Sequence, residues 1–484
     1  MSNVRKSLFW SFSERYLGLL IYLVTTMVLA RILTPHEIGM YSLCVAFTGI
    51  ASVLRDFGVS EYVIQEKNLD EEKLRSAHAV AFITAWSIGI VLFLLRSVIA
   101  DYYKEPALVP VLSVACLNFL ILPFASPSYA LLHREMAFRQ LFYIQTTTNL
   151  SYAAVGISLA LLDFGPIALA WASCLSILVQ SLYVASIKPR ETFMLPRFRA
   201  VKGVLSYGTM FSSSRIIEAV GGNSQDLVIG RQFGFESLGL FSRAFSLIEM
   251  FTTYFSNTVS RVATPAFANS HREGECLANS YAHAVSIVSV IAIPFYLFMS
   301  LMAPDIIMVL FGPQWEQAAP IARALAAFGA ITGLSNLALN VLTAAGQVKR
   351  RLQITMIVTP IHIINITIAS MFSLQAITYA WLCTWVLTLF IYEYHLRQAL
   401  SFGFMDLWKA CRKSLLVAFT GLAIQLSFFL LINEFDAHSL VRLIIIGPLA
   451  VGTWVFLLKA FNHPLFAELL TLYRSAMQRL KTKP

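Results

Sequence analysis

Charged side chains lie inside several of the long apolar stretches of this 484-residue chain. A charge at the centre of a bilayer costs about 2.5–3.5 kcal/mol on insertion scales, so a residue that bears this cost should have a partner or a task. Arginine suits phosphate recognition, because its planar guanidinium donates two hydrogen bonds at once. Embedded carboxylates suit ion coupling and gating. The candidate binding arginines are Arg15, Arg55, Arg215 and Arg261, and the candidate coupling or gating acids are Asp56, Glu218, Asp226 and Glu249.

Helical spacing places three of these residues near one face of a single helix. Arg215 and Glu218 are three positions apart, so they can form an ion pair along the helix. Such a static pair is the alternative to exposure in a polar lumen. Asp226 follows Arg215 by eleven residues, about three turns, and returns close to the same face. Gly221-Gly222 between them would let the helix bend, as a moving gate helix requires.

The composition identifies the elements that carry these residues. Hydrophobic residues make up 57% of the chain and charged residues only 13%, against roughly 25% charged in a soluble domain. The chain is therefore expected to be an all-α polytopic membrane protein. A net charge of +10 does not indicate nucleic-acid binding, because no basic run is interleaved with aromatic residues as a base-stacking surface requires.

Fourteen apolar segments have the length of about 20 residues that a helix needs to cross the hydrocarbon core. The first six are predicted at 10–33, 39–62, 78–99, 108–131, 140–162 and 165–187. The next six are predicted at 206–231, 239–262, 280–303, 319–344, 353–372 and 375–397, and the last two at 413–432 and 440–460.

Lys and Arg distribute unequally between alternate connections of this layout. One side, which includes both termini, carries twenty-five of these cations, the other side carries seven, and four lie within spans. Because cytoplasmic loops are enriched in Lys and Arg, both termini are predicted in the cytoplasm. An even number of spans fits this alternation.

A repeat divides the spans into two lobes. The segment Arg31-Ile-Leu-Thr-Pro-His-Glu-Ile-Gly-Met-Tyr-Ser42 returns as Arg231-Gln-Phe-Gly-Phe-Glu-Ser-Leu-Gly-Leu-Phe-Ser242, with Arg, Gly and Ser in register. Six-helix repeats enter the membrane in the same direction, so a pseudo-two-fold axis along the membrane normal should relate them. The predicted parts are the N-lobe 1–188, the basic linker 189–202, the C-lobe 203–400, two extra helices in 401–461 and a cytoplasmic tail 462–484.

Charge is concentrated in the first two helices of each repeat, which predicts that these four helices line a shared cavity. Arg55 and Asp56 are adjacent and point to different sides of their helix, so they pair poorly with each other and favour exposure to that lumen. The Arg-to-Gly segments are interpreted as short structural outer loops, with Arg31 and Arg231 capping the helices before them.

Other signals support no catalytic role. The chain has no P-loop, HExxH, paired DxD or GxSxG pattern and no large loop, so we expect neither an enzyme nor a bound cofactor or metal. The six cysteines are isolated and are interpreted as small buried side chains. His78 and His283 open their spans and are interpreted as structural, with a proton relay as the alternative. The tail from Asn462 either lies on the anionic membrane surface or is solvated.

The repeated motifs resemble those of a known family. The stretch Leu29–Tyr41 followed by Asp56-Phe-Gly58, and Asp226–Gly234 leading into Leu238–Phe241, resemble the signatures of Wzx-type polysaccharide exporters, in the colanic-acid or exopolysaccharide branch of the multidrug/oligosaccharidyl-lipid/polysaccharide flippase superfamily. The second copy departs from the first at Phe235 and Phe241, which replace proline and tyrosine.

The resemblance implies a flippase for undecaprenyl-diphosphate-linked oligosaccharide repeat units that works by alternating access. It implies that lumen arginines bind the lipid diphosphate, with Arg15, Arg55, Arg215 and Arg261 as the candidates by position. The lipid-linked oligosaccharide is the expected partner, the polysaccharide polymerase and export machinery are further candidates, and we expect a monomer that binds no nucleic acid.

Two questions stay open at the level of sequence. Membrane potential favours outward movement of negative charge by about 2.3 kcal/mol per charge per 100 mV, and ion antiport through Glu218 or Asp226 is the rival source of energy. The competing functions are a cation-coupled multidrug antiporter of the same superfamily and, with less support, an intramembrane glycosyltransferase or polymerase.

Overall fold

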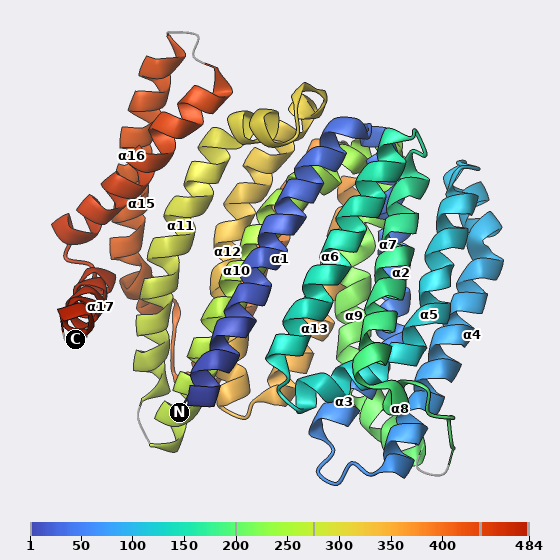
Figure 1. Cartoon of the computed structure of the whole chain (residues 1–484). Coiled ribbons are helices and arrows are strands. Elements are labelled where there is room, and N and C mark those ends of the chain that lie inside the picture. Colours follow the sequence, from blue (N-terminus) through green and yellow to red (C-terminus); the bar gives the residue numbers. More distant parts are fainter. Residues whose placement is uncertain (1, 199–200, 274–275, 435–437, 482–484) are drawn as a thin grey trace. The chain divides into compact units, whose positions relative to one another are not determined.

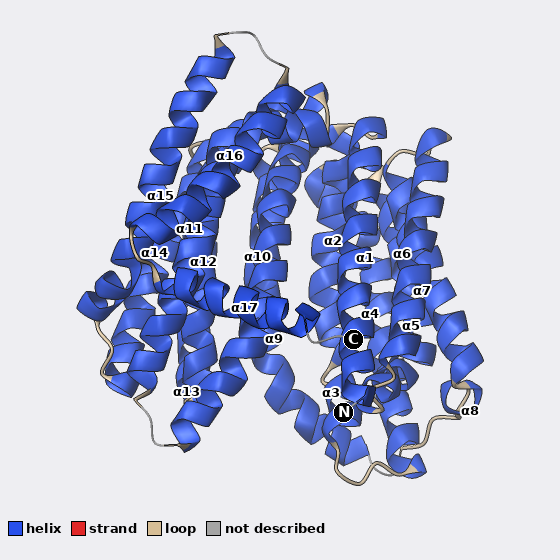
Figure 2. Ribbon diagram, turned by 60° about the vertical axis from the view of Figure 1, so that its left-hand side comes forward, coloured by secondary structure: helices blue, strands red, loops and turns tan. Residues whose placement is uncertain are grey.

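The computed structural model describes residues 2–198, 201–273, 276–434 and 438–481, and the side chains of some residues inside these ranges lie outside the description. All regular structure in these ranges is helical (Figure 2). The chain forms two compact units, Met1–Gly239 and Leu240–Pro484, each with its own packed interior. The predicted all-α polytopic fold class is therefore confirmed.

The first unit contains seven long helices and two short ones among its described residues. The long helices are α1 (Ser2–Ile32), α2 (Pro35–Asp56), α4 (Glu71–Tyr103), α5 (Leu108–Arg134), α6 (Phe138–Leu161), α7 (Pro166–Ile187) and α9 (Val201–Gln232). The short helices are α3 (Val59–Gln65) and α8 (Pro189–Thr192). Helix α9 packs against α2, α3 and α4 and so belongs to this unit by its contacts. The lobe boundary at 189–202 stays a prediction.

The second unit begins at Leu240, inside α10, and contains seven further α-helices among its described residues. These helices are α10 (Gly234–Arg272), α11 (Leu277–Leu310), α12 (Ala319–Ala344), α13 (Val348–Ala369), α14 (Leu374–Leu400), α15 (Phe404–Asn433), α16 (Ser439–Ala460) and α17 (Pro464–Lys481). A short 3₁₀ helix, η1 (Pro313–Ala318), precedes α12. Helix α17 contacts α16 and α11.

The long helices fall where the sequence predicts apolar spans. Within the described residues, ten of them are long and apolar enough to cross a membrane. The helices α6, α9 and α10 are long but carry more polar residues. Polar helices of a membrane protein are expected to face protein or a water-filled cavity instead of lipid.

The predicted span 39–62 is wrong in one respect, because the chain breaks inside it. Helix α2 ends at Asp56, and the next two residues, Phe57 and Gly58, adopt left-handed backbone conformations with φ of 40° and 70°. Glycine tolerates this conformation at no steric cost. The short helix α3 then starts after this turn, so Glu61 lies on α3 and not on a continuation of α2.

Connections predicted on the same side of the membrane meet at one end of the first unit, where Figure 1 shows α3 and α8. A guanidinium nitrogen of Arg134 donates to the Val63 carbonyl oxygen at 2.9 Å. The ammonium group of Lys188 lies 2.7 Å from a carboxylate oxygen of Glu135. These contacts join the connections after α2, α5 and α7, as the alternation of Lys and Arg predicts.

The two copies of the repeated motif meet through their glycines. A Cβ on Gly39 would lie 1.8 Å from the carbonyl oxygen of Phe235, and a Cβ on Gly239 would lie 1.9 Å from that of Pro35. Only glycine fits such an approach of two backbones. The interpretation as outer loops is wrong in detail, because Pro35–Gly39 forms the first turns of α2 and Thr34 closes a capping box with Glu37.

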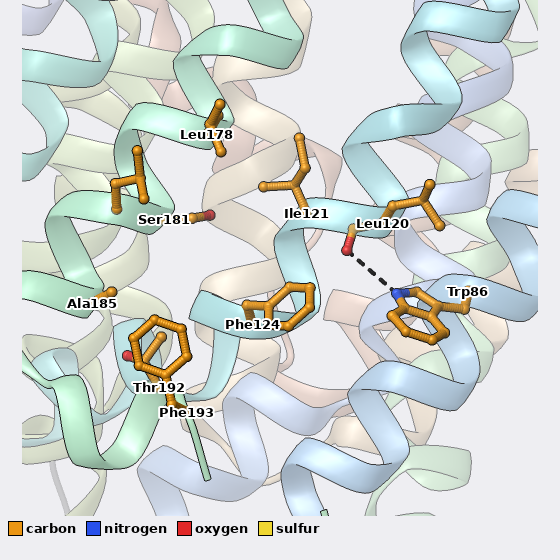
Figure 3. Close-up of a pocket in the computed structure, with 10 residues that line it drawn as sticks. Trp86, Leu120, Ile121, Phe124, Leu178, Ser181, Ala185, Thr192 and Phe193 are labelled. Atoms are coloured by element: carbon orange, nitrogen blue, oxygen red, sulfur yellow. Dashed lines mark hydrogen bonds between the residues drawn. The ribbon is translucent and has the colours of Figure 1, made fainter. Parts of the chain in front are cut away.

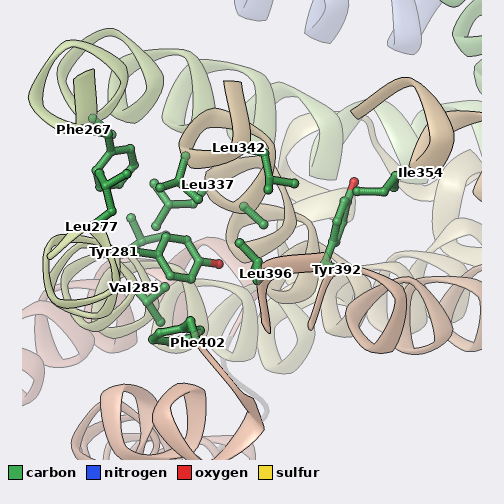
Figure 4. Packing of buried hydrophobic residues seen from close by; sticks show 14 of the residues in the cluster. Phe267, Leu277, Tyr281, Val285, Leu337, Leu342, Ile354, Tyr392, Leu396 and Phe402 are labelled. Atoms are coloured by element: carbon green, nitrogen blue, oxygen red, sulfur yellow. The ribbon is translucent and has the colours of Figure 1, made fainter. Parts of the chain in front are cut away.

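Buried side chains of α10, α11, α12 and α14 form a core in the second unit (Figure 4). Phe267, Tyr281, Leu337, Tyr392 and Phe402 are at most 6% exposed in this cluster. Polar contacts between helices accompany it, as in a hydrogen bond of 2.7 Å from the Asn340 amide to Ser260. Interhelical hydrogen bonds of this kind help to join helices in a membrane, where lipid provides no hydrophobic drive for their association.

Candidate functional site

Three charged side chains from three elements meet in the first unit. A guanidinium nitrogen of Arg215, on α9, lies 2.7 Å from a carboxylate oxygen of Glu61, on α3. The same nitrogen lies 3.8 Å from a carboxylate oxygen of Asp56, the last residue of α2. The Arg215 side chain is 45% exposed, whereas Glu61 and Asp56 are 21% and 22% exposed. We refer to Asp56, Glu61 and Arg215 as the carboxylate–arginine cluster.

The break after α2 positions the two carboxylates of this cluster. Because the chain turns at Phe57-Gly58, Glu61 returns to the same side as Asp56 and both reach Arg215. The Ser60 hydroxyl donates a hydrogen bond of 2.9 Å to Asp56 and so orients that carboxylate. The second carboxylate oxygen of Glu61 is buried and has no hydrogen-bond partner among the described residues. This oxygen can still accept a hydrogen bond from a ligand.

Arg55 borders a small space that adjoins the cluster at Asp56. It lines a small space between α2, α4 and α5 together with residues that include Asp56, Ala81 and Pro123. Its guanidinium carbon lies 6.0 Å from the centroid of the Phe119 ring, at the limit of a cation–π contact. The predicted exposure of Arg55 to the same lumen as Arg215 stays untested.

The remaining predicted residues are spread over the two units. Arg15 is half-buried on α1, and Glu218 is exposed on α9 one turn from Arg215. Asp226 is half-buried farther along α9. Glu249 is exposed on α10 in the second unit, and the side chain of Arg261, on the same helix, lies outside the described residues.

The structure thus brings together two of the eight predicted residues, Asp56 and Arg215, and adds Glu61. Arg215 pairs with carboxylates of α2 and α3, so a static pair with Glu218 alone does not describe its surroundings. The sequence signal for Glu61 was the Phe-Gly pair after Asp56, which marks a turn where the apolar pattern suggests a continuous helix.

The cluster can exchange its anion. Solvent-exposed ion pairs contribute only about 0–1 kcal/mol, and Arg215 is 45% exposed, so separating it from its carboxylates should cost less than breaking a buried pair. A ligand with more negative charge than a carboxylate, such as a phosphate, can then occupy the fork of the guanidinium. Within the described part of the chain, no group of three or more His, Cys, Asp or Glu side chains is arranged to hold a metal ion.

Other predicted structural residues have defined surroundings. Arg31 and Arg231 lie in the last turns of α1 and α9, where a cation interacts favourably with the helix dipole. His78 is fully buried in the first unit. His283 is half-exposed, and its ring nitrogen lies 2.8 Å from a Glu468 carboxylate oxygen on α17.

A chain built from long apolar helices, with a charged cluster where α2, the short helix α3 and α9 meet, has the architecture of a polytopic membrane transporter. Residues 28–320 match the family described as polysaccharide biosynthesis protein, and the chain belongs to this family. The resemblance to Wzx-type exporters is confirmed.

Relatives in other bacteria carry related names. The chain is 25% identical over 333 residues to the teichuronic acid biosynthesis protein TuaB of Bacillus subtilis, with 68% of each chain covered. It is 24% identical to the lipopolysaccharide biosynthesis protein WzxC of Escherichia coli, over 65% of this chain and 64% of the relative. It is also 25% identical to the succinoglycan biosynthesis transport protein ExoT of Rhizobium meliloti, over 67% and 66%.

Solved structures share the fold at low sequence identity. A structure of the lipid II flippase MurJ in an inward closed conformation aligns with a TM-score of 0.76 and 14% identity, covering 95% of this chain and 99% of that one. An inward-facing multidrug resistance transporter of the MATE family aligns with a TM-score of 0.63 and 16% identity, covering 79% and 95%. The fold is therefore that of the superfamily to which these transporters belong.

Proposed function

We propose that the chain is a flippase that moves undecaprenyl-diphosphate-linked oligosaccharide repeat units from the inner to the outer leaflet of the bacterial inner membrane, for surface or exopolysaccharide synthesis. The observation that carries this proposal is the half-exposed Arg215 held by Asp56 and Glu61. Membership of a polysaccharide biosynthesis family and the fold shared with a lipid II flippase support it.

The substrate chemistry explains why such a protein needs a charged site. A glycan and a diphosphate cannot cross hydrocarbon unaided, because moving each polar group out of water without a hydrogen-bond partner costs about 2–7 kcal/mol of free energy. A polar cavity shields these groups while the polyprenyl tail remains in lipid. In this scheme the diphosphate replaces Asp56 and Glu61 at Arg215, since it offers more charge and can accept two hydrogen bonds from the planar guanidinium.

The other parts of the scheme are proposals of the same kind. Arg15, Arg55 and Arg261 are further candidates for contact with the diphosphate, and transport proceeds by alternating access with both termini in the cytoplasm. The displaced Asp56, together with Glu218, Asp226 and Glu249, supplies the candidate coupling or gating groups. Membrane potential alone favours export of two negative charges by about 4.6 kcal/mol at 100 mV, twice the value for one charge.

Deletion and complementation test the proposal. Loss of the gene is expected to abolish the surface polysaccharide while lipid-linked repeat units accumulate in the inner leaflet, and the wild-type gene restores export. If the deletion strain exports normal polysaccharide, or if repeat units stop at an earlier step of assembly, the chain is not the flippase.

A cation-coupled drug antiporter is the second candidate. The specific observation in its favour is the buried, unpartnered carboxylate oxygen of Glu61, which could receive a proton or another cation. Expression in a drug-sensitive strain distinguishes the two functions. The flippase proposal predicts unchanged tolerance of cationic drugs, and a Glu61-dependent rise in tolerance would favour the antiporter.

A further inference from the structure

An apolar hollow of about 510 Å³ opens between α4, α5, α7 and α8 in the first unit. Figure 3 shows Ile121 and Phe124 of α5 and Leu178 and Ala185 of α7 bordering it from two sides, with Trp86 beyond α5. Its volume lies within the range of about 300–1,000 Å³ that is usual for ligand pockets. None of these residues belongs to the carboxylate–arginine cluster.

Large apolar side chains around the hollow are exposed to their surroundings. Trp86, Phe124 and Leu182 are 41%, 40% and 60% exposed. The Trp86 ring is held in place, because its indole nitrogen donates a hydrogen bond of 3.3 Å to the Leu120 carbonyl oxygen. A hollow with such walls gives water few partners, and leaving it empty would forfeit dispersion contacts, so hydrocarbon is the matching occupant.

One end of the hollow is polar. Thr192 lines this end and is only 3% exposed, yet its hydroxyl oxygen has no hydrogen-bond partner among the described residues. Arg190 comes two positions before Thr192, with Glu191 between them, and its side chain is 78% exposed and lies 3.0 Å from a carboxylate oxygen of Glu71. That carboxylate also pairs with Arg75 at 2.8 Å, so Arg190 shares its acidic partner with a second cation.

The segment after α8 has the composition of a chain at a membrane surface. Phe193, Leu195 and Phe198 are 68%, 75% and 63% exposed, and Arg197 between them is exposed as well. Exposed aromatic and aliphatic residues interleaved with arginine are typical of segments that lie in the headgroup region. This segment therefore locates the polar end of the hollow at the boundary of the apolar layer.

We propose that the hollow binds one acyl chain of an anionic phospholipid, with the lipid phosphate at Arg190 and the Thr192 hydroxyl. The apolar walls accept the chain. The Thr192 hydroxyl, which has no partner among the described residues, supplies a donor for an ester or phosphate oxygen, and the exposed Arg190 guanidinium favours a negative headgroup. The site does not depend on the proposed transport activity. It would hold a resident lipid at the end of the unit where the loops after α2, α5 and α7 meet.

Photolabelling tests the site. The full-length protein is reconstituted in nanodiscs of equal amounts of phosphatidylcholine and phosphatidylglycerol, one of which carries a photoreactive group on its acyl chain, and labelled peptides are mapped. Peptides of α5 and α7 around the hollow should be labelled more strongly by phosphatidylglycerol. Ala185→Trp, which fills the hollow, should remove this labelling, whereas Leu94→Trp, at a 67% exposed position of α4 outside the lining, should leave it unchanged.

The headgroup is tested separately. Arg190→Gln should reduce the preference for phosphatidylglycerol over phosphatidylcholine by about five-fold, the effect of one cation near the surface. Lys67→Gln, an exposed cation on a connection at the same end, is the matched control and should change it little. Equal labelling in wild type and Ala185→Trp, or an unchanged preference in Arg190→Gln, would overturn the proposal. Stronger labelling by a photoreactive polyprenyl phosphate would show that the occupant is an isoprenyl chain, against the proposal.

Discussion

Arg215 in the first unit and Arg442 in the second unit both pair with carboxylates of other helices, but their surroundings differ. Arg442 lies 2.8 Å from Asp305 on α11, and these side chains are only 20% and 2% exposed. Arg442 also donates a hydrogen bond of 2.6 Å to the Asn433 side chain. Arg215 is 45% exposed and is shared by two carboxylates, Asp56 and Glu61, which are 22% and 21% exposed.

The difference separates an arginine that holds the fold from one that can bind a ligand. A buried ion pair is strongly destabilising to break, by about 3–5 kcal/mol, because its partner is left as an uncompensated charge. The pair between Arg442 and Asp305 therefore fastens α16 to α11. Arg215 is more exposed than Arg442, so opening its cluster should cost less than breaking the buried pair, and Arg215 can exchange its partner.

Arg215→Ala should have the largest effect on transport. Hydrogen bonds to charged groups contribute about 1.5–3 kcal/mol, so loss of the guanidinium should weaken diphosphate binding about 10- to 100-fold. Surface polysaccharide should then disappear while the amount of membrane-inserted protein stays normal, as measured by immunoblotting of membranes. Full complementation by Arg215→Ala would remove Arg215 from the binding site.

Arg442→Leu should have the opposite profile. It leaves the buried Asp305 without its cation, so the protein should lose about 3–5 kcal/mol of stability, visible as a lower thermal midpoint in detergent and a lower amount in the membrane. Export per molecule should remain. Arg442→Leu combined with Asp305→Leu should regain stability, because no uncompensated charge remains buried. A double variant no more stable than Arg442→Leu alone would show that the unpaired Asp305 is not the cause of the lost stability.

Arg215→Lys should retain part of the activity. Lysine keeps the positive charge but presents a point charge instead of a planar fork, so an intermediate level of polysaccharide is expected. Wild-type export by this variant would mean that charge alone is sufficient at the site. Export as low as that of Arg215→Ala would mean that the bidentate geometry is indispensable.

His463, between α16 and α17, should give a smaller effect that appears only in stability. Its ring nitrogen Nε2 lies 3.1 Å from the Ser286 hydroxyl and 3.2 Å from the Ser414 hydroxyl, and burial lowers the pKa of His463 from 6.5 to about 4. Between these pH values the unfolded chain binds the proton and the folded chain does not, so stability should fall as the pH falls from about 6.5 to about 4. His463→Gln should make the thermal midpoint less dependent on pH in this window. An unchanged dependence on pH would show that His463 is not the group that titrates.

The sequence predicts the helices well, because the thickness of a bilayer sets their length. The span predicted at 319–344 coincides with α12, and the span at 165–187 differs from α7 by one residue. The break at Phe57-Gly58 is missed, since Val59, Tyr62 and Val63 continue the apolar pattern and are buried in the first unit. Local periodicity contains no information about this change of direction.

The site is predicted less completely for a related reason. Arg215 is placed correctly among the embedded charges, but its partner Glu61 is 154 positions away in the chain. Spacing along a helix reports only neighbours within a turn or two, so it suggests Glu218 instead. The glycines of the repeat give a similar lesson, because their in-register spacing is visible in the sequence and their mutual contact appears only in the folded chain.

The most direct test of the central claim measures flipping itself. The full-length protein is reconstituted in proteoliposomes with a labelled undecaprenyl-diphosphate-linked oligosaccharide, and transfer between leaflets is followed with an external glycan-modifying reagent. Wild type and Arg442→Leu, assayed at a temperature where both are folded, should transfer the lipid at comparable rates, whereas Arg215→Ala should not exceed protein-free vesicles. Equal transfer by Arg215→Ala and wild type would contradict the assignment of the carboxylate–arginine cluster as the diphosphate site.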